Sequence, residues 1–279
     1  MTIFRLTQIT DSHLSRRHQA FTDNFQRVSQ YIDDTLPDLV INSGDLGFNG
    51  YDHPDDLSFA KAQHDALSVP CRFLPGNHDI GDNPTRVGAP LTQPASEERL
   101  SFYQSIFGED RWHFEAAGWS FVGLNSLVMN TPLAREDEQF DWLAEQLASL
   151  HGRPLAVFIH KPLFLNAPDD PELAASAIRY VPQPARARLI DMLGKVDLRL
   201  VACGHVHQRR DFTYRHVRHI WAPSTGFILK SNERQELMGV KEVGLVEYVF
   251  QPDSFEVRHV RAPGQVDTDL FGGLEPSGH

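Results

Sequence analysis

Short apolar runs alternate with amphipathic segments along most of this 279-residue chain. Apolar side chains at helical spacing, such as Phe21, Phe25, Val28 and Ile32, predict helices between the runs. This alternation is typical of a layered α/β fold in which the loops at strand ends carry the chemistry. We predict strands at Ile3–Thr10, Asp38–Asn42, Cys71–Leu74, Trp119–Asn125, Leu155–Ile159, Leu198–Ala202, His216–Trp221, Gly244–Phe250 and Phe255–Val260.

Two stretches rich in glycine or proline, Gly81–Pro94 and Asn166–Pro184, interrupt the alternation. Periodic segments resume on either side of each, so we interpret them as long loops of one domain and not as linkers. Residues 262–279 contain glycine and proline with little apolar periodicity. We expect a loosely ordered C-terminal tail there.

Five of the predicted strands are followed almost at once by a polar cluster. The clusters are Asp11-Ser12-His13, Gly44-Asp45, Gly76-Asn77-His78-Asp79, His160 and Gly204-His205-Val206-His207. In open α/β sheets, ligands bind outside the carboxyl ends of the strands. Five clusters placed in this way are therefore expected to converge on one crevice.

The clusters differ in how strongly each one, taken alone, indicates a metal site. From residue frequencies, D-x-H is expected about once in such a chain, and G-H-x-H only about 0.05 times. Taken alone, Asp11 and Gly44-Asp45 are more often turn or cap residues, and a lone histidine such as His160 is more often a satisfied buried residue. The ordered set of five clusters favours metal ligation for all three.

The residue types suit a pair of cations. Two metal ions about 3.5–4 Å apart need oxygen donors, imidazoles and a carboxylate that touches both ions. We expect Asp45 to be that bridge. We expect His205 and His207 to face the crevice together because alternate side chains of an extended segment share one side. Glycines before the ligands, at Gly44, Gly76 and Gly204, are expected to permit sharp turns.

The five clusters resemble the pattern of the calcineurin-like metallophosphoesterases, which runs D-x-H, G-D, G-N-H-[D/E], H and G-H-x-H. Chain length and the Ile9–His13 segment look most like the bacterial cyclic-nucleotide and glycerophosphodiester phosphodiesterases. The resemblance implies a four-layer α/β/β/α sandwich with a dinuclear metal site at the strand carboxyl ends. Because seven expected ligands spread from Asp11 to His207 must meet at one centre, we expect residues 1–261 to form a single metallophosphoesterase domain.

Residue roles follow from the resemblance by position. It implies that Asp11, His13 and His207 hold one metal, that Asn77, His160 and His205 hold the other, and that Asp45 bridges them. The two ions would come from iron, manganese or zinc, a choice that the sequence leaves open. The implied reaction is in-line attack on phosphorus by a hydroxide held between the metals. His78 would be the catalytic histidine, Asp79 would orient it, and Asn77 and His78 would contact substrate.

One position departs from the family pattern. Cyclic-nucleotide members often carry a second histidine after the metal-binding one, but here Lys161 follows His160. The departure weakens the case for cyclic AMP as substrate and leaves the metal ligand in place. We expect Gly47–Tyr51, Ile80–Arg86 and Phe164–Arg179 to form the pocket wall. Arg209-Arg210 is predicted to be a solvated turn, with a phosphate contact as the alternative.

Small-molecule phosphodiesters, of the cyclic-nucleotide or glycerophosphodiester type, are therefore the expected substrates. A phosphomonoesterase or phosphoprotein phosphatase on the same metal centre is the nearest alternative. A non-catalytic scaffold of the same fold is a third possibility, disfavoured because none of the expected ligands is missing.

Composition limits the expected binding partners, disulfides and cellular location. Lys and Arg total 26 against 37 Asp and Glu, a formal charge of -11, so nucleic-acid duplexes are disfavoured partners. The two cysteines, Cys71 and Cys203, predict small strand thiols and no disulfide framework. No signal peptide or membrane-spanning run is evident, so we expect a cytoplasmic protein, with a homodimer possible.

Of the 14 histidines, five fall in the clusters. For the other nine, among them His53, His64, His113, His216, His219 and His259, surface or packing roles are favoured.

Overall fold

The apolar runs form two mixed sheets. The structure, a computed structural model, describes residues 3–84, 91, 93–170, 177–231 and 235–271. The first sheet has the order β11-β10-β1-β2-β3, in which β1, β2 and β3 are parallel. Its strands are β1 (Phe4–Ile9), β2 (Leu39–Asn42), β3 (Cys71–Phe73), β10 (Leu245–Gln251) and β11 (Ser254–Val260).

The second sheet has the order β4-β5-β6-β7-β9-β8. Its central strands β5, β6, β7 and β9 are parallel, and the two edge strands β4 and β8 are antiparallel to their neighbours. The strands are β4 (Trp112–Ala116), β5 (Trp119–Leu124), β6 (Leu155–Ile159), β7 (Leu198–Cys203), β8 (Arg210–Tyr214) and β9 (Val217–Trp221).

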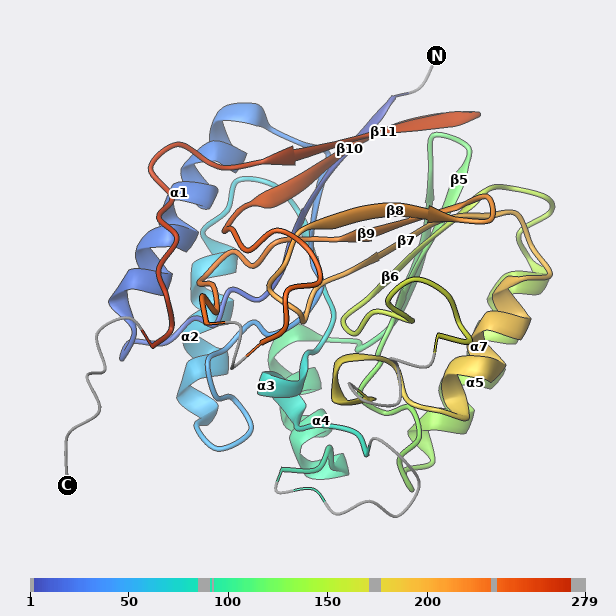
Figure 1. Ribbon diagram of the computed structural model, residues 1–279, viewed down its shortest axis with the longest axis horizontal. Coiled ribbons are helices and arrows are strands. Elements are labelled where there is room, and N and C mark those ends of the chain that lie inside the picture. The colour runs from blue at the N-terminus through green and yellow to red at the C-terminus, as the bar shows by residue number, and fades with distance from the viewer. Residues whose placement is uncertain (1–2, 85–90, 92, 171–176, 232–234, 272–279) are drawn as a thin grey trace.

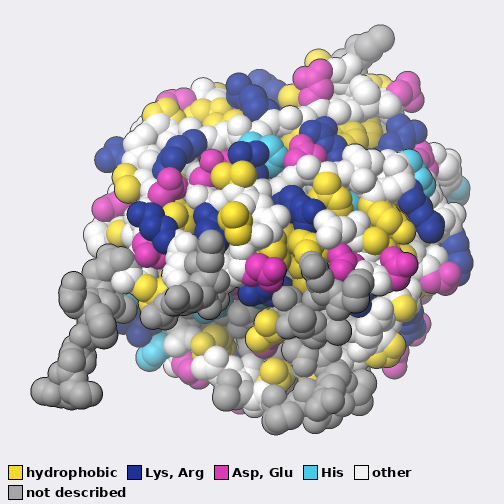
Figure 2. Space-filling view, in the orientation of Figure 1, with side chains coloured by type: hydrophobic (Ala, Val, Ile, Leu, Met, Phe, Trp, Pro, Cys, Tyr) yellow, Lys and Arg dark blue, Asp and Glu magenta, His cyan; other side chains and the backbone are white. Residues whose placement is uncertain are grey.

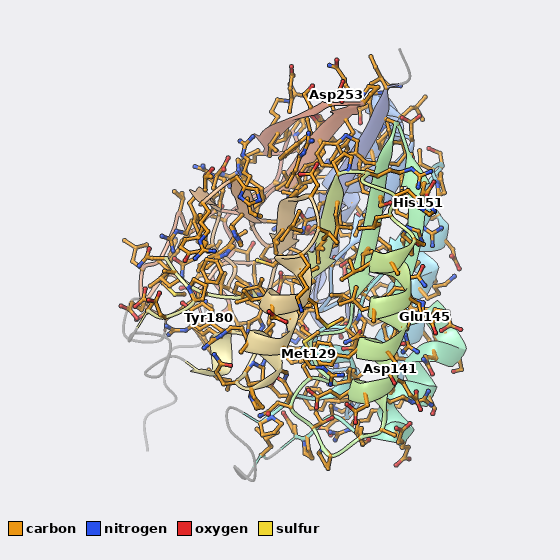
Figure 3. The ribbon with its side chains drawn as sticks, turned by 90° about the vertical axis from the view of Figure 1, so that its right-hand side faces the viewer. Met129, Asp141, Glu145, His151, Tyr180 and Asp253 are labelled. Carbon is orange, nitrogen blue, oxygen red and sulfur yellow. The ribbon has the colours of Figure 1, made fainter. Side chains whose placement is uncertain are left out.

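Helices cover the outer face of each sheet (Figure 1). They are α1 (Gln19–Thr35), α2 (Pro54–Asp65), α3 (Asn77–Ile80), α4 (Glu97–Phe107), α5 (Arg135–Ala148) and α7 (Ala185–Leu193), with a short 3₁₀ turn at Ala177–Arg179. Helices α1, α2 and α4 pack on the first sheet, and α5 and α7 on the second. In Figure 3, exposed Asp141 and Glu145 lie along α5, while Phe140 and Leu143 of the same helix are buried.

The sandwich has three apolar layers between its four structural layers. One layer joins α1, α2 and α4 to the first sheet, and another joins α5 and α7 to the second. The middle layer lies between the sheets and includes Trp119, Phe121, Phe158 and Phe250. Edge-to-face contacts such as Phe121 with Phe250, whose ring centroids are 4.8 Å apart, connect the two sheets. The predicted α/β/β/α order is therefore confirmed.

All nine predicted strands are present, with ends within two residues of the prediction. Strands β4 and β8 were not predicted. Arg210 begins β8 instead of lying in a solvated turn, and its guanidinium donates to the Leu165 carbonyl and to Asn166 Oδ1. Arg209 pairs with Glu242.

The two long loops lie where they were predicted, in so far as their residues are described. Residues 85–90 and 92 of the first, and 171–176 of the second, lie outside the described residues. The predicted tail is described as far as Phe271. Ala262 and Gln265 are buried there, and Val266 exchanges two hydrogen bonds with Asn24 of α1. The boundary at 261/262 stays a prediction.

The thiols of Cys71 and Cys203 are free and lie in β3 and β7, as predicted. Among the described residues, no helix is both long and apolar enough to cross a membrane. Figure 2 shows basic and acidic side chains interspersed over one face of the molecule.

A buried histidine predicts one part of the pH dependence of stability. His219 on β9 packs against Phe164 and Phe212, and burial lowers its pKa to about 4 from an ordinary 6.5. Between these pH values the unfolded chain binds a proton that the folded chain does not, so the free energy of unfolding falls as the pH falls. From pH 7 to pH 5 this amounts to about 2 kcal/mol.

We expect His219→Phe, which keeps a ring stacked on Phe212, to lose that share of the pH dependence. Urea unfolding of both proteins at pH 7 and pH 5 measures it. Equal losses of stability in the two proteins would contradict the prediction.

Candidate metal centre

The residues of the five clusters lie together at one end of the sandwich. Asp11 and His13 follow β1, Asp45 follows β2, His160 follows β6, and His205 and His207 follow β7; Asn77 and His78 begin α3, just after β3. Parallel strands bring these ends to the same edge of each sheet. Seen from the side, Met129 and Tyr180 lie toward one end of the molecule and Asp253 at the other (Figure 3).

A first group of donors comes from both sheets. Single ligand atoms of Asp11, His13, Asp45 and His207 all lie within 4.8 Å of one another, and all four residues are buried. His207 Nε2 lies 3.2 Å from Asp11 Oδ1 and 3.1 Å from His13 Nε2. The three residues expected to hold one metal, with the expected bridge, thus form one group.

A second group shares Asp45 with the first. Asp45, His160 and His205 also offer ligand atoms within 4.8 Å of one another. Asp45 Oδ2 lies 3.6 Å from His13 Nε2 on one side and 3.4 Å from His160 Nε2 on the other. The amide of His78 donates to the second oxygen, Oδ1, over 2.8 Å. Asp45 Oδ2 therefore faces both groups, as a bridging ligand would.

Asn77 belongs beside this second group. Its Oδ1 lies 3.3 Å from His160 Nε2. A carboxamide oxygen is a hard donor that complements two imidazoles and a carboxylate around a divalent ion. All seven residues predicted to bind metal are therefore close together, in the two sets that the resemblance implies.

Backbone carbonyls orient several of the imidazoles. The Nδ1 atoms of His160 and His207 lie 2.9 and 3.1 Å from the carbonyl oxygens of Ser43 and Phe227. A carbonyl only accepts, so each Nδ1 carries a proton, and Nε2 is the nitrogen that faces the centre and has a lone pair when the ring is neutral. His205 has the opposite orientation, since its Nε2 lies 3.3 Å from the Ile178 carbonyl oxygen.

One buried nitrogen without a hydrogen-bond partner indicates that these residues suit a metal ion. His205 Nδ1 is buried and has no hydrogen-bond partner among the described residues. With Nε2 donating to Ile178, the neutral ring has its lone pair on Nδ1, which is available to a cation. Buried polar atoms are normally paired, and a metal ion held by this group would be the missing partner of Nδ1.

Electrostatics also favour cations here. Burial lowers the pKa of His13 and of His205 well below 6.5, so both rings are neutral. Burial would raise the pKa of Asp45, but His160 and His78 hold it well below its usual range. Burial opposes protonation of His160, yet Asp45 raises its pKa to about 9. A bound cation would replace that proton as the partner of Asp45.

The ligand-bearing loops have an unusual backbone. Asp11, His13, Asp45, His205 and His207 all have positive φ, between 45° and 70°. This corrects the expectation that His205 and His207 lie on an extended segment: the left-handed conformation turns both toward the centre. Aspartate and histidine tolerate this region better than most residues, at a cost of roughly 1–3 kcal/mol each.

The glycines before the ligands act in two ways. Gly44 has φ +117°, which supports the predicted turn. Gly204 is needed for close approach instead, because a Cβ there would lie 2.0 Å from Thr10 Oγ1 and 2.5 Å from Asp11 Oδ2. At Gly76 a Cβ would lie 2.1 Å from Asp45 Oδ1. These two glycines allow neighbouring loops to pack closely against Asp11 and Asp45.

His78 lies beside the donors, but Asp79 does not orient its ring. The His78 imidazole meets that of His13 edge to face at 4.6 Å, and its Nδ1 lies 2.7 Å from the Phe48 carbonyl oxygen. Asp79 instead accepts hydrogen bonds from the amides of Leu46, Gly47 and Gly76. The predicted role of Asp79 is thus corrected: it joins the β2 loop to the start of α3, and Phe48 sets the His78 ring.

Lys161, the residue that departs from the family pattern, is buried beside His160. Its Nζ donates to Asp82 Oδ1 over 2.5 Å and to Asn83 Oδ1 over 2.7 Å. The side chain therefore anchors the start of the Gly81–Pro94 loop.

Sequence reasoning missed the partners that orient the rings. Phe48, Ser43, Ile178 and Phe227 act through main-chain carbonyls, which every residue has, so no side-chain pattern marks them. The Phe227 ring also lies 4.8 Å from the His13 ring and 4.5 Å from the His207 ring. It follows β9, outside the five clusters.

Several known proteins are similar to this chain over most of its length. A probable glycerophosphodiester phosphodiesterase, GpdQ of Arcobacter nitrofigilis, is 26% identical over 229 residues, covering 80% of this chain and 73% of the relative. The 3',5'-cyclic-nucleotide phosphodiesterase alr5338 of Nostoc is 28% identical over 261 residues, 85% of each chain. Human serine/threonine-protein phosphatase CPPED1 is 27% identical over 57% of this chain and 48% of its own length.

Solved structures share the fold. A dimetal phosphatase from Danio rerio superposes with a TM-score of 0.62 at 14% identity and covers 93% of this chain and 96% of its own. At that identity the likeness concerns the fold. The sequence model of the calcineurin-like phosphoesterase family matches residues 4–209 of this chain, which contain all seven donors and His78. This chain belongs to the calcineurin-like phosphoesterase family.

Proposed function

We propose that this chain is a dinuclear-metal phosphodiesterase that hydrolyses small-molecule phosphodiesters of the cyclic-nucleotide or glycerophosphodiester type. The observation that carries the proposal is the pair of donor groups that share Asp45, with His78 beside them. Two relatives that align with most of the chain are named as phosphodiesterases of these two substrate types.

The residues around the centre support this chemistry. Asp11, His13 and His207 would hold one ion, Asn77, His160 and His205 the other, and Asp45 both. When bound, such a pair supplies a water of lowered pKa and neutralises charge on the phosphoryl oxygens. The chain itself orients the imidazoles through the carbonyls of Ser43, Phe227 and Ile178.

His78 is the proton donor in this proposal. Its Nδ1 proton is engaged by the Phe48 carbonyl, so the other nitrogen, Nε2, is the atom that donates to the leaving oxygen when the ring is protonated. Asn77 and His78 together would contact the phosphate.

Phosphomonoesters are the second candidate, because CPPED1 is named as a protein phosphatase. Bis-p-nitrophenyl phosphate and p-nitrophenyl phosphate, each assayed with the manganese-reconstituted protein, distinguish the two. We expect the diester to have the higher kcat/KM. Turnover of the monoester alone would overturn the phosphodiesterase proposal, and no turnover of either with two bound metals would favour a scaffold.

A substrate panel then narrows the diester class. It covers cyclic nucleotides, glycerophosphodiesters and nucleoside diphosphate conjugates. Since Lys161 is turned toward Asp82 and Asn83, we expect cyclic AMP not to be the preferred member.

The remaining features of the proposal concern setting and assembly. The metals would be iron, manganese or zinc, and the chain would act in the cytoplasm, as a possible homodimer, without binding nucleic-acid duplexes or membranes. Residues 1–261 would form one domain. The apolar layer that both sheets share supports that last point.

A further inference from the structure

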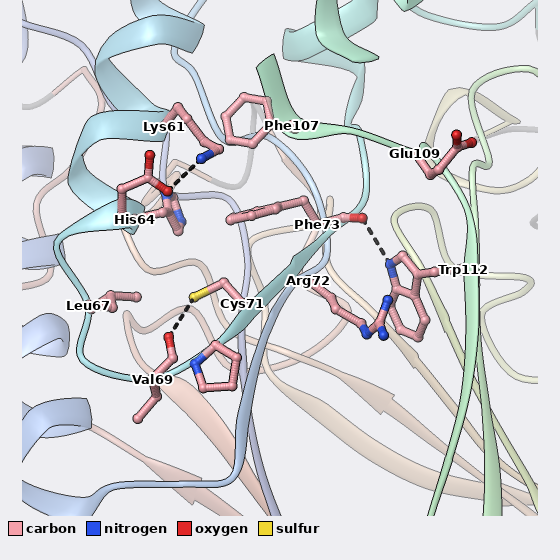
Figure 4. Close-up of a pocket in the computed structure, with 12 residues that line it drawn as sticks. Lys61, His64, Leu67, Val69, Cys71, Arg72, Phe73, Phe107, Glu109 and Trp112 are labelled. Atoms are coloured by element: carbon pink, nitrogen blue, oxygen red, sulfur yellow. Dashed lines mark hydrogen bonds and ion pairs between the residues drawn. The ribbon is translucent and has the colours of Figure 1, made fainter. Parts of the chain in front are cut away.

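His64 is a buried histidine outside the donor groups. It lies near the end of α2, 2% exposed, with its ring 4.7 Å from that of Phe25 and 5.3 Å from that of Phe73. It also lines a cleft of about 510 Å³ that is bounded by α2, β3 and Trp112 (Figure 4). The ring therefore packs against two aromatic side chains, one tilted and one edge-on, and the residue borders the cleft.

The hydrogen bonds of His64 define its tautomer. Nδ1 lies 2.8 Å from the Ala60 carbonyl oxygen, so Nδ1 carries the proton. Burial lowers the pKa of the ring to about 4, so the ring is neutral and Nε2 has a free lone pair. Asn42 Nδ2 lies 2.9 Å from that atom and donates to it.

Asn42 connects His64 to two ligand-bearing loops. The side chain is fully buried at the end of β2. Its Nδ2 also donates to Ser12 Oγ over 3.0 Å, and its Oδ1 accepts from the Gly44 amide at 3.2 Å. Ser12 lies between Asp11 and His13, and Gly44 precedes Asp45. One carboxamide thus holds the loops that supply three of the donors in the first group.

Only one orientation of that carboxamide makes all three contacts. Turned over, its oxygen would face the lone pair of His64 Nε2, and its NH₂ group would face the Gly44 amide donor. His64 and the Gly44 amide both distinguish the two orientations, whereas Ser12 can either donate or accept. Groups that hydrogen-bond metal ligands commonly affect metal affinity by about 10–100-fold, and His64 acts further out, through Asn42 and the loops that Asn42 holds.

We propose that His64 is a positioning residue for the metal centre: as a hydrogen-bond acceptor it fixes the Asn42 carboxamide, and through it the Asp11–His13 and Gly44-Asp45 loops. The inference rests on the proposed metal ligands. His64 then has a role as a hydrogen-bond acceptor in addition to the packing role that the sequence favours.

Two substitutions of similar size distinguish the effect of the hydrogen-bond acceptor of His64 from the effect of its side-chain volume. His64→Gln keeps an acceptor in Oε1, whereas His64→Leu fills the space without one. We expect His64→Leu to bind Mn²⁺ roughly 10–100-fold more weakly in chelator competition, and His64→Gln to bind close to wild type. Equal affinities in the two variants would overturn the proposal.

The cleft allows a second test. In His64→Ala, imidazole can enter from the cleft and occupy the vacated site beside Asn42. We expect Mn²⁺ affinity to fall in this variant and to recover as imidazole is added. Recovery with imidazole but not with toluene, which has no acceptor, supports the proposal; equal effects of both, or of neither, count against it.

His219→Ala is the matched control. His219 is similarly buried, has the same lowered pKa of about 4, and stacks on Phe212 in the second sheet. Its loss should lower the melting temperature and leave Mn²⁺ affinity unchanged. If the wild-type chain binds no Mn²⁺ and hydrolyses no phosphate ester, the proposed function fails; if it does both and His64→Leu matches it, this inference alone fails.

Discussion

Replacing Asp45 by asparagine is expected to remove metal from both halves of the centre and to lower kcat/KM by more than about 10³-fold, equivalent to about 4 kcal/mol. Asp45 Oδ2 is a carboxylate oxygen that faces both His13 and His160. The amide oxygen of asparagine can still accept from the His78 main chain, so the loop should keep its position. Metal content per chain, measured by elemental analysis after gel filtration, reports the result.

Asp110→Asn is the control for loss of a buried carboxylate. Asp110 is fully buried and accepts hydrogen bonds from Gln104 and Asn125, and it belongs to neither donor group. We expect this variant to keep its metal. Two full metal equivalents in Asp45→Asn would show that the carboxylate is not a shared ligand.

Removing the imidazole of His78 is expected to have the second largest effect, a loss of about 10²–10⁴ in kcat with metal content unchanged. The hydrogen bond that His78 donates to Asp45 comes from its main-chain amide, which His78→Ala keeps. If the ring protonates the leaving oxygen, the loss should be greater for esters with poor alkoxide leaving groups than for p-nitrophenyl esters.

The dependence on leaving group distinguishes proton donation from simple binding. The same factor for every ester would assign His78 to phosphate binding instead of proton transfer. Full activity with every phosphate ester tested would remove it from the site altogether.

The arrangement of layers was predictable because strands buried on both faces have a strong apolar signal. β5, β6 and most of β7 are buried throughout, and the sequence places all three. The two strands that were missed are edge strands. β8 alternates half-exposed with exposed residues and begins at Arg210, whose charge favours a turn until its contacts with Asn166 and Leu165 are known.

The donors were predictable because their side-chain chemistry is rare in combination. Their geometry was not predictable from spacing, since the left-handed backbone of His205 and His207 depends on contacts with other loops. The amide of His205 donates to Asp11 Oδ2 over 2.9 Å, a contact between residues 194 positions apart. The role of Asp79 was misjudged for a related reason: adjacency to His78 in sequence suggested a contact that the start of α3 directs elsewhere.

The apolar layer between the sheets also acts as a spacer for the metal centre. Asp11, His13 and Asp45 extend from the first sheet, and His160, His205 and His207 from the second. The separation of these two sets is therefore fixed by the thickness and alignment of the middle layer, which includes Trp119, Phe121 and Phe250. Because close-packed interiors transmit small displacements, sliding of one sheet over the other would change the distances between the donor atoms of the two sheets. Metal bound by donors of both sheets would in turn resist that sliding and hold the two sheets in a fixed alignment.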